Sequence, residues 1–96
     1  MTNLRMAQIL IVEDNDADIL LVKEALREVG ILFNIDRFRD GQDCIRSLAT
    51  WADHPTPDLV IIDLNLPTTH GFEVLKAVRS NSRFERVPVA ILEIAH

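Results

Sequence analysis

Two short runs of apolar residues constrain the fold of this chain more than any other feature. Ile9 to Val12 and Leu59 to Ile62 are rich in branched side chains and show no alternation with polar residues. Runs of this kind form strands covered on both faces, as in a parallel sheet between two layers of helices. Each run ends in carboxylates, Glu13 and Asp14 after the first and Asp63 after the second. The sequence therefore predicts two buried strands with acidic ends.

Helical spacing follows the first run. An apolar stripe recurs every three or four residues and consists of Ile19, Val22, Leu26 and Val29. That period indicates an amphipathic helix. Asn15 or Asp16 can cap its beginning, and Gly30 suits the position just after its end. A helix is therefore expected between the acidic residues and Gly30.

The remaining segments continue the alternation of strands and helices. Residues 33–38 predict a short edge strand, and 87–92 predict a last, apolar one. Between them we expect a helix after Asp40, with an apolar face of Cys44, Leu48 and Trp51, and a helix after Asp63, with a face of Phe72, Leu75 and Val78. Strands that alternate with helices imply an α/β fold, a doubly wound parallel sheet with helices on both faces.

Composition limits what such a chain can do. Its 96 residues make one domain, 1–96, and the formal charge of −5 gives no attraction to nucleic acid or to anionic lipid. The single Cys44 cannot form an internal disulfide, and no apolar run is long enough to span a bilayer. No secretory signal peptide is recognisable at the start. We expect a cytoplasmic protein without nucleic-acid or membrane partners.

The acidic strand ends suggest a metal site. In a doubly wound sheet, ligands bind beyond the carboxyl ends of the strands, where Glu13, Asp14 and Asp63 are expected. Carboxylates held together repel one another unless a hard cation such as Mg²⁺ compensates their charge. A carboxylate beside Mg²⁺ can attack a phosphoryl group, and Asp63 is the candidate. The alternative is that these residues are only solvated turn formers.

Several motifs together resemble a known family. ILIVEDN at 9–15, DLVIIDLNLP at 58–67 and the downstream Gly71 are similar to the receiver domains of two-component response regulators. The stretch EDNDADILLVKEAL resembles the small single-domain regulators associated with bacterial phytochromes. The resemblance implies a flavodoxin-like receiver fold with strand order 2-1-3-4. It also implies a sensor histidine kinase as partner, with a bacterial phytochrome as one candidate.

The resemblance also assigns roles to individual residues. Asp63 would accept the phosphoryl group, and the protein would be a signalling phosphoprotein rather than an enzyme. Asp14 would coordinate Mg²⁺ directly, and Glu13 would contact it through water. Asn65 would offer its backbone carbonyl to the metal.

The chain departs from the family pattern in two places. Receivers carry a Ser or Thr after the fourth strand, where this chain has Glu93, and a Lys after a fifth strand, whereas the last lysine here is Lys76. The expectation is a receiver truncated after its fourth strand, lacking the fifth strand and the last helices. Pro67 and Gly71 would shape the loop after Asp63, and His70 is not expected to be catalytic.

Three functions remain open. The first is a Mg²⁺-dependent phosphoacceptor, impaired in this short form. The second is a non-phosphorylated interaction module or an inert truncation, which would form homo-oligomers through strand 87–92 or by exchange of elements. The third is a phosphohydrolase of the haloacid dehalogenase type. That family requires a second Asp two residues after the nucleophile, where this chain has Asn65.

Overall fold

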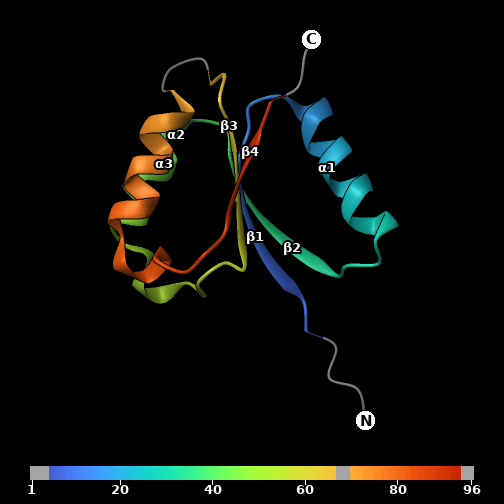
Figure 1. Ribbon diagram of the computed structural model, residues 1–96, viewed down its shortest axis with the longest axis horizontal. Coiled ribbons are helices and arrows are strands. Elements are labelled where there is room, and N and C mark those ends of the chain that lie inside the picture. The colour runs from blue at the N-terminus through green and yellow to red at the C-terminus, as the bar shows by residue number, and fades with distance from the viewer. Residues whose placement is uncertain (1–4, 67–69, 94–96) are drawn as a thin grey trace.

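The fold is a parallel sheet between two layers of helices (Figure 1). The computed structural model describes residues 5–66 and 70–93. Its elements are β1 (Ala7–Val12), α1 (Asp16–Glu28), β2 (Phe33–Phe38), α2 (Gly41–Leu48), η1 (Trp51–Asp53), β3 (Leu59–Asp63), α3 (Gly71–Ser80), η2 (Ser82–Phe84) and β4 (Val89–Leu92). All pairings are parallel, in the order β2-β1-β3-β4. The predicted fold class and strand order are confirmed.

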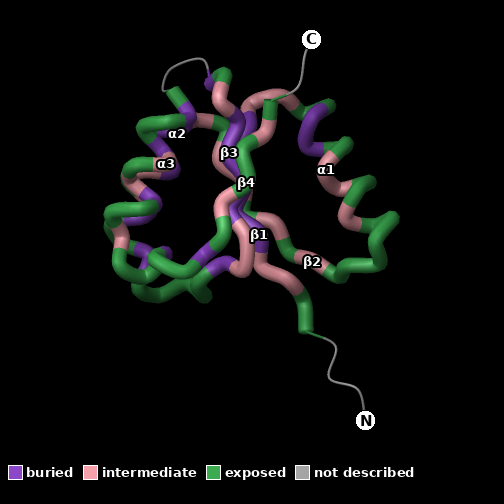
Figure 2. The backbone as a smooth tube through the Cα atoms, viewed as in Figure 1, coloured by how far each residue is buried: buried purple, intermediate pink, exposed green. Residues whose placement is uncertain are grey.

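β1 and β3 form the centre of the sheet and are its most buried strands (Figure 2). Leu10 pairs with Val60, and Val12 pairs with Ile62, and all four are fully buried. Helices cover both faces here, so neither strand can place polar side chains on alternate positions without burying them. This explains why both runs in the sequence are continuously apolar.

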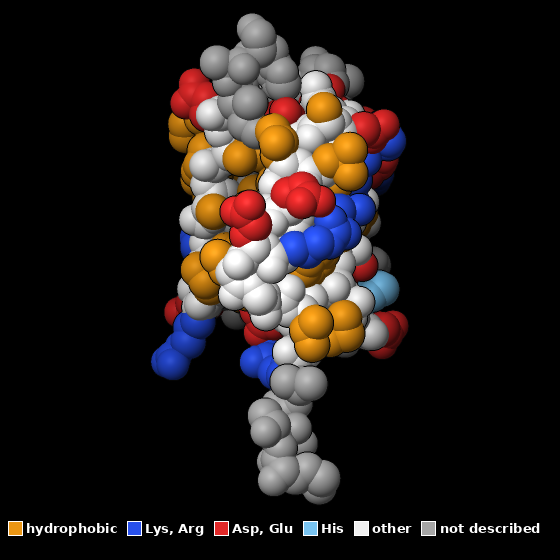
Figure 3. All heavy atoms as spheres, turned by 90° about the vertical axis from the view of Figure 1, so that its right-hand side faces the viewer, with side chains coloured by type: hydrophobic (Ala, Val, Ile, Leu, Met, Phe, Trp, Pro, Cys, Tyr) orange, Lys and Arg blue, Asp and Glu red, His pale blue; other side chains and the backbone are white. Residues whose placement is uncertain are grey.

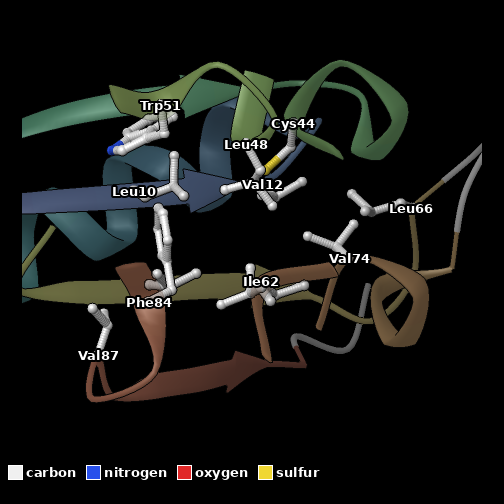
Figure 4. Packing of buried hydrophobic residues seen from close by; sticks show 12 residues of the cluster. Leu10, Val12, Cys44, Leu48, Trp51, Ile62, Leu66, Val74, Phe84 and Val87 are labelled. Atoms are coloured by element: carbon white, nitrogen blue, oxygen red, sulfur yellow. The ribbon is translucent and has the colours of Figure 1, made fainter. Parts of the chain in front are cut away.

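The larger core lies between the sheet and the pair α2 and α3 (Figure 4). It contains Leu10, Val12, Cys44, Leu48, Trp51, Val60, Ile62, Leu66, Val74, Val78, Phe84 and Val87. The rings of Trp51 and Phe84 meet edge to face, with centroids 5.7 Å apart. Trp51 Nε1 donates to the carbonyl oxygen of Pro55 at 3.1 Å, so its polar atom is satisfied.

In the described part of the chain, α1 is the one helix on the opposite face of the sheet, and the core there is smaller. Its buried residues are Ile9, Ile11, Ile19 and Ile61. Several hydrophobic side chains remain exposed on this side of the molecule, as Figure 3 shows. Leu20 and Leu21 of α1 are 59% and 57% exposed. Among the described residues, this face is therefore less completely covered than the other.

Capping residues define the ends of α1 as predicted. Asn15 is the N-cap, and its side-chain oxygen accepts hydrogen bonds from the amides of Ala17 and Asp18. Gly30 has φ of +76° and follows the helix end, and a glycine adopts this conformation at little cost. Val29, expected on the buried stripe, lies outside the helix and is 69% exposed, because the chain has already turned away from the sheet.

Two other expectations from the apolar spacing were wrong in detail. Phe72 was predicted on the buried face of α3, but it is 62% exposed. Val78 is buried as predicted, and Val74 is buried with it. The spacing 72, 75, 78 and the spacing 71, 74, 78 are both helical, and only packing distinguishes them. Trp51 is buried as expected, although it lies in η1 rather than α2.

Some predictions fall at the margins of the described chain. β4 begins at Val89, and Val87 packs in the core before the strand starts. Within the described residues, β4 pairs only with β3 and forms one edge of the sheet. Pro67 lies outside the described residues. No helix in the described part of the chain is long and apolar enough to cross a bilayer.

Candidate metal centre

The three predicted carboxylates meet at one edge of the sheet. β1 and β3 are adjacent and parallel, so their carboxyl ends lie side by side (Figure 1). Glu13 directly follows β1, and its amide donates to the carbonyl oxygen of Phe38 at 3.0 Å. Asp63 is the last residue of β3. One carboxylate oxygen each from Glu13, Asp14 and Asp63 lie within 4.8 Å of one another.

Glu13 is the most deeply buried member of this cluster. Its exposed fraction is 1%, compared with 8% for Asp63. Oε1 accepts a hydrogen bond from the amide of Asn15 at 3.0 Å, whereas Oε2 is buried with no hydrogen-bond partner. Burial, together with the nearby charge of Asp63, raises the pKa of Glu13 to about 7. An ionised Glu13 therefore needs a compensating positive charge.

Asp63 is held by the turn that follows it. Its Oδ1 accepts a hydrogen bond from the amide of Asn65 at 2.9 Å. The amide of Leu64 donates to the carbonyl of Leu92 at 3.3 Å, and the amide of Gly71 donates to the carbonyl of Leu64 at 3.4 Å. The residue after the phosphoacceptor candidate, Leu64, is therefore attached both to β4 and to the start of α3.

The residues present fit a divalent cation. Carboxylate oxygens are the ligands that Mg²⁺ prefers, and three of them converge here. Glu13 and Asp63 accept hydrogen bonds from the backbone amides of Asn15 and Asn65, which carry no full positive charge. The unpartnered Oε2 of Glu13 is the clearest sign, because a buried carboxylate oxygen without a partner costs free energy unless another group contacts it. A bound cation would satisfy that oxygen directly or through water.

The other predicted residues take defined positions around this cluster. Asn65 is exposed and contacts Asp63 through its amide. His70 is the exposed N-cap residue of α3, and its side chain makes no capping hydrogen bond. Glu93 is exposed and directly follows β4, whose last residue, Leu92, is the register partner of Asp63.

Sequence reasoning missed two arginines beside the cluster. Arg37 and Arg39, from β2 and the residue after it, contact the loop that carries Glu13 and Asp14. Both also donate to a carboxylate oxygen of Asp16, at 2.7 and 2.6 Å. The sequence does contain a sign of this role for Arg37. Arg37 continues the alternation of Phe33 and Ile35, so a charged residue falls on a strand face that is expected to be apolar.

Comparison with known proteins defines the class. Residues 9–96 match the response regulator receiver domain family, and the chain belongs to that family. Among curated proteins it is similar to the response regulator Rcp1 of Synechocystis, with 37% identity over 91 residues. That alignment covers 92% of this chain and 62% of Rcp1, so the chain spans about three fifths of that relative.

Solved structures agree with this assignment. The phosphorylated cyanobacterial phytochrome response regulator RcpA superposes with a TM-score of 0.80 at 36% identity, over 95% of this chain and 67% of that one. The Mn²⁺-bound form of Rcp1 gives 0.77 at 36% identity, over 94% and 67%. The receiver domain of a Pseudomonas aeruginosa sensor histidine kinase, with Mg²⁺ in its active-site cleft, gives 0.73 at 26% identity, over 93% and 68%. The predicted resemblance to phytochrome-associated response regulators is confirmed.

Proposed function

We propose that this chain accepts a phosphoryl group on the carboxylate of Asp63, from the phosphohistidine of a sensor kinase, in a Mg²⁺-dependent reaction. The observation that carries the proposal is the convergence of Glu13, Asp14 and Asp63 within 4.8 Å at the ends of two adjacent strands. The similarity to RcpA, whose structure is of the phosphorylated protein, supports the same role. Its similarity to a phytochrome response regulator also supports a phytochrome as the kinase.

Each residue has a defined part in the proposed reaction. Asp14 would coordinate Mg²⁺ directly, Glu13 through water, and Asn65 through its backbone carbonyl. Bound Mg²⁺ neutralises charge on the oxygens of the transferring phosphoryl group. One oxygen of Asp63 attacks phosphorus, a new O–P bond forms, and the N–P bond of the donor breaks. The histidine nitrogen keeps the bonding electron pair, so the product is an aspartyl phosphate and a free histidine.

The geometry around Asp63 suits a nucleophile that must be held in one orientation. The hydrogen bond from the Asn65 amide to Oδ1 fixes the orientation of the Asp63 carboxylate. Asp63 is 8% exposed, so only a small part of the residue is accessible to a phosphodonor. Restriction of this kind favours in-line attack, because positioning supplies much of the rate enhancement in phosphoryl transfer.

Phosphorylation with a small donor tests the proposal. The purified chain is incubated with acetyl phosphate and Mg²⁺, and intact mass spectrometry is expected to detect the addition of one phosphoryl group. Asp63→Asn should abolish it. Asp53→Asn is the matched control, because Asp53 is an exposed carboxylate outside the cluster, and it should be labelled normally. Absence of labelling with acetyl phosphate and with a phosphorylated kinase would refute the proposal.

A non-phosphorylated receiver module is the second candidate. The observation that favours it is Glu93, which follows the register partner of Asp63 at the position where the family carries Ser or Thr. A carboxylate near the phosphoryl group would repel its oxygens. Mg²⁺ binding without labelling would identify this function, and labelling restored by Glu93→Thr would show that Glu93 is the cause.

Two further predictions remain to be tested. Self-association through β4 is supported by the edge position of that strand in the described sheet and by the 43% exposure of Ile91. Sedimentation analysis should detect dimers at tens of micromolar chain, and a purely monomeric chain would refute self-association.

The phosphohydrolase alternative loses its support, since the chain belongs to the receiver family, and we propose that the protein is not an enzyme.

A further inference from the structure

Two arginines hold the loop between β1 and α1. Arg37 Nε donates to the backbone carbonyl oxygen of Glu13 at 3.0 Å, and its Nη1 donates to Asp16 Oδ1 at 2.7 Å. Arg39 Nη2 donates to the same oxygen of Asp16 at 2.6 Å, and its Nη1 lies 3.4 Å from the carbonyl oxygen of Asp14. The loop that supplies two of the three clustered carboxylates is therefore attached to β2 by side chains.

Arg37 occupies an unusual place for a charge. It pairs in register with Ile11, and it lies on the same face of β2 as Phe33 and Ile35, which pack in the core beneath α1. Its side chain is only 21% exposed, and its bond to Asp16 places it at the first turn of the helix. The amino end of a helix carries partial positive charge, so a cation there is unfavourable unless other contacts compensate it.

Contacts with β2 hold the main chain of Glu13 from both sides, and Arg37 makes one of them. The amide of Glu13 donates to the carbonyl of Phe38 at 3.0 Å, and its own carbonyl accepts from Arg37 Nε at 3.0 Å. Both main-chain polar groups of Glu13 are therefore bonded to β2. The position of the next residue, Asp14, is restricted as well, because the peptide plane that joins them is held by Arg37.

Charge and geometry make opposite predictions for metal binding. A positive charge beside the cluster should weaken the binding of a divalent cation, whereas a fixed loop should strengthen it. Asp16 accepts hydrogen bonds from both arginines, so its one negative charge offsets part of their two positive charges. The two effects of Arg37 have opposite signs, so the change in Mg²⁺ affinity on its substitution shows which is larger. Arg39 is 62% exposed and makes only a long contact to the loop backbone, so its geometric effect should be small.

We propose that Arg37 is a positioning residue for the metal centre, which holds the main chain of Glu13 and Asp14 in the geometry that binds a divalent cation. The inference deepens the proposed function and rests on its metal site. Arg39, by contrast, acts through charge and through Asp16. The two arginines lie two positions apart in the chain and both contact Asp16, and so they form a matched pair for experiment.

Mg²⁺ titration calorimetry of the full chain tests this assignment with charge held constant. Arg37→Lys keeps the charge but cannot bond Glu13 and Asp16 together, since an ammonium lacks the planar fork of a guanidinium. We expect it to weaken Mg²⁺ binding about tenfold, as loss of a group that orients metal ligands commonly does. Arg39→Lys should change the Kd by less than about twofold. Equal Mg²⁺ affinity of Arg37→Lys and the wild type would overturn the proposal.

Arg37→Gln separates geometry from charge by the sign of its effect. If Arg37 acted only as a charge, its neutralisation would tighten Mg²⁺ binding; if it positions the loop, binding weakens. Circular dichroism establishes that each variant is folded at the temperature of titration. A tighter Kd for Arg37→Gln would also overturn the proposal.

A measurement on the wild type covers the case in which neither Arg37 variant folds. The Nε–H of Arg37 should give a slowly exchanging NMR signal that persists in both the free and the Mg²⁺-saturated protein, because its bond to Glu13 is kept. Loss of that protection on addition of Mg²⁺ would contradict the proposal. The two hypotheses fail separately: a wild type that binds Mg²⁺ but is never phosphorylated refutes the proposed function and leaves the role of Arg37 intact.

Discussion

The first residue of α3 touches the backbone of the phosphoacceptor candidate: a Cβ atom at Gly71 would lie 2.4 Å from the carbonyl oxygen of Asp63. It would also lie 2.9 Å from the Cα of Leu64. Real Cβ atoms do not approach backbone atoms so closely, and neither neighbour is a flexible side chain that can move aside. The resemblance to receivers assigned Gly71 to loop shape, and this contact supplies the physical reason.

Gly71→Ala should therefore disturb the metal centre as well as the stability. We expect the free energy of unfolding to fall by about 2 kcal/mol or more, since a rigid steric conflict must be relieved by movement of the backbone. Phosphoryl labelling should fall with it, because the displaced atoms belong to Asp63 and Leu64. Urea denaturation and the labelling assay measure the two effects.

Gly30→Ala is the control for this substitution. Gly30 has φ of +76°, but a Cβ there would meet nothing within 4 Å. The cost should be about 1 kcal/mol, from backbone conformation alone, and labelling should be unchanged. Equal effects of the two substitutions on labelling would show that the contact at Gly71 has no bearing on the site.

The raised pKa of Glu13 predicts how stability depends on pH. The pKa of about 7 in the folded chain exceeds the ordinary value of 4.5, so the folded state binds this proton more tightly than the unfolded state. Its contribution to stability is fully present below about pH 4.5 and is lost as the pH rises to 7. Without divalent cations, the free energy of unfolding should therefore decrease across this window.

Glu13→Gln and Mg²⁺ each test the origin of that slope. Glutamine does not titrate, so the variant should show a flatter pH dependence than the wild type between pH 4.5 and 7. Mg²⁺ that binds the ionised cluster, as we propose, should restore stability at pH 7 in the wild type. An identical pH profile for wild type and Glu13→Gln would show that another group is responsible.

Phe84 and Phe72 should differ widely in their contribution to stability. Phe84 is fully buried against Trp51 in the larger core, whereas Phe72 is 62% exposed on α3. Phe84→Ala should lower the free energy of unfolding by about 3–5 kcal/mol, through lost burial and the cavity left behind. Phe72→Ala should change it by less than about 1 kcal/mol. Chemical denaturation of both variants measures the contrast.

The thiol of Cys44 should be unreactive in the folded protein. Cys44 is fully buried in the core, and burial raises the pKa of its thiol to about 12. Since the thiolate is the reacting form, a thiol reagent such as DTNB should modify it only after unfolding. Rapid stoichiometric reaction in native buffer, as fast as in guanidinium chloride, would contradict this burial.

The strands and the carboxylates were predictable because their signals are local. An uninterrupted apolar run such as Ile9 to Val12 describes a doubly covered strand wherever it occurs, and parallel strands must end at one edge of a sheet. Those two facts place Glu13 and Asp63 at the same edge of the sheet, and the position of ligand sites in doubly wound sheets predicts that they lie together. Helix periodicity was less decisive, since α3 could bury Phe72 or Val74, and only the packing against α2 selected Val74.

Sequence by itself thus determined the parallel sheet and the acidic strand ends with Glu13, Asp14 and Asp63, because each follows from patterns within a few neighbouring residues. The strand order followed from the resemblance to receiver domains. Tertiary structure alone decided that Arg37 reaches the Glu13 carbonyl and that Gly71 lies against Asp63. Both contacts join elements that are distant along the chain, and their existence depends on strand register and helix placement to within about an ångström, which no local pattern specifies.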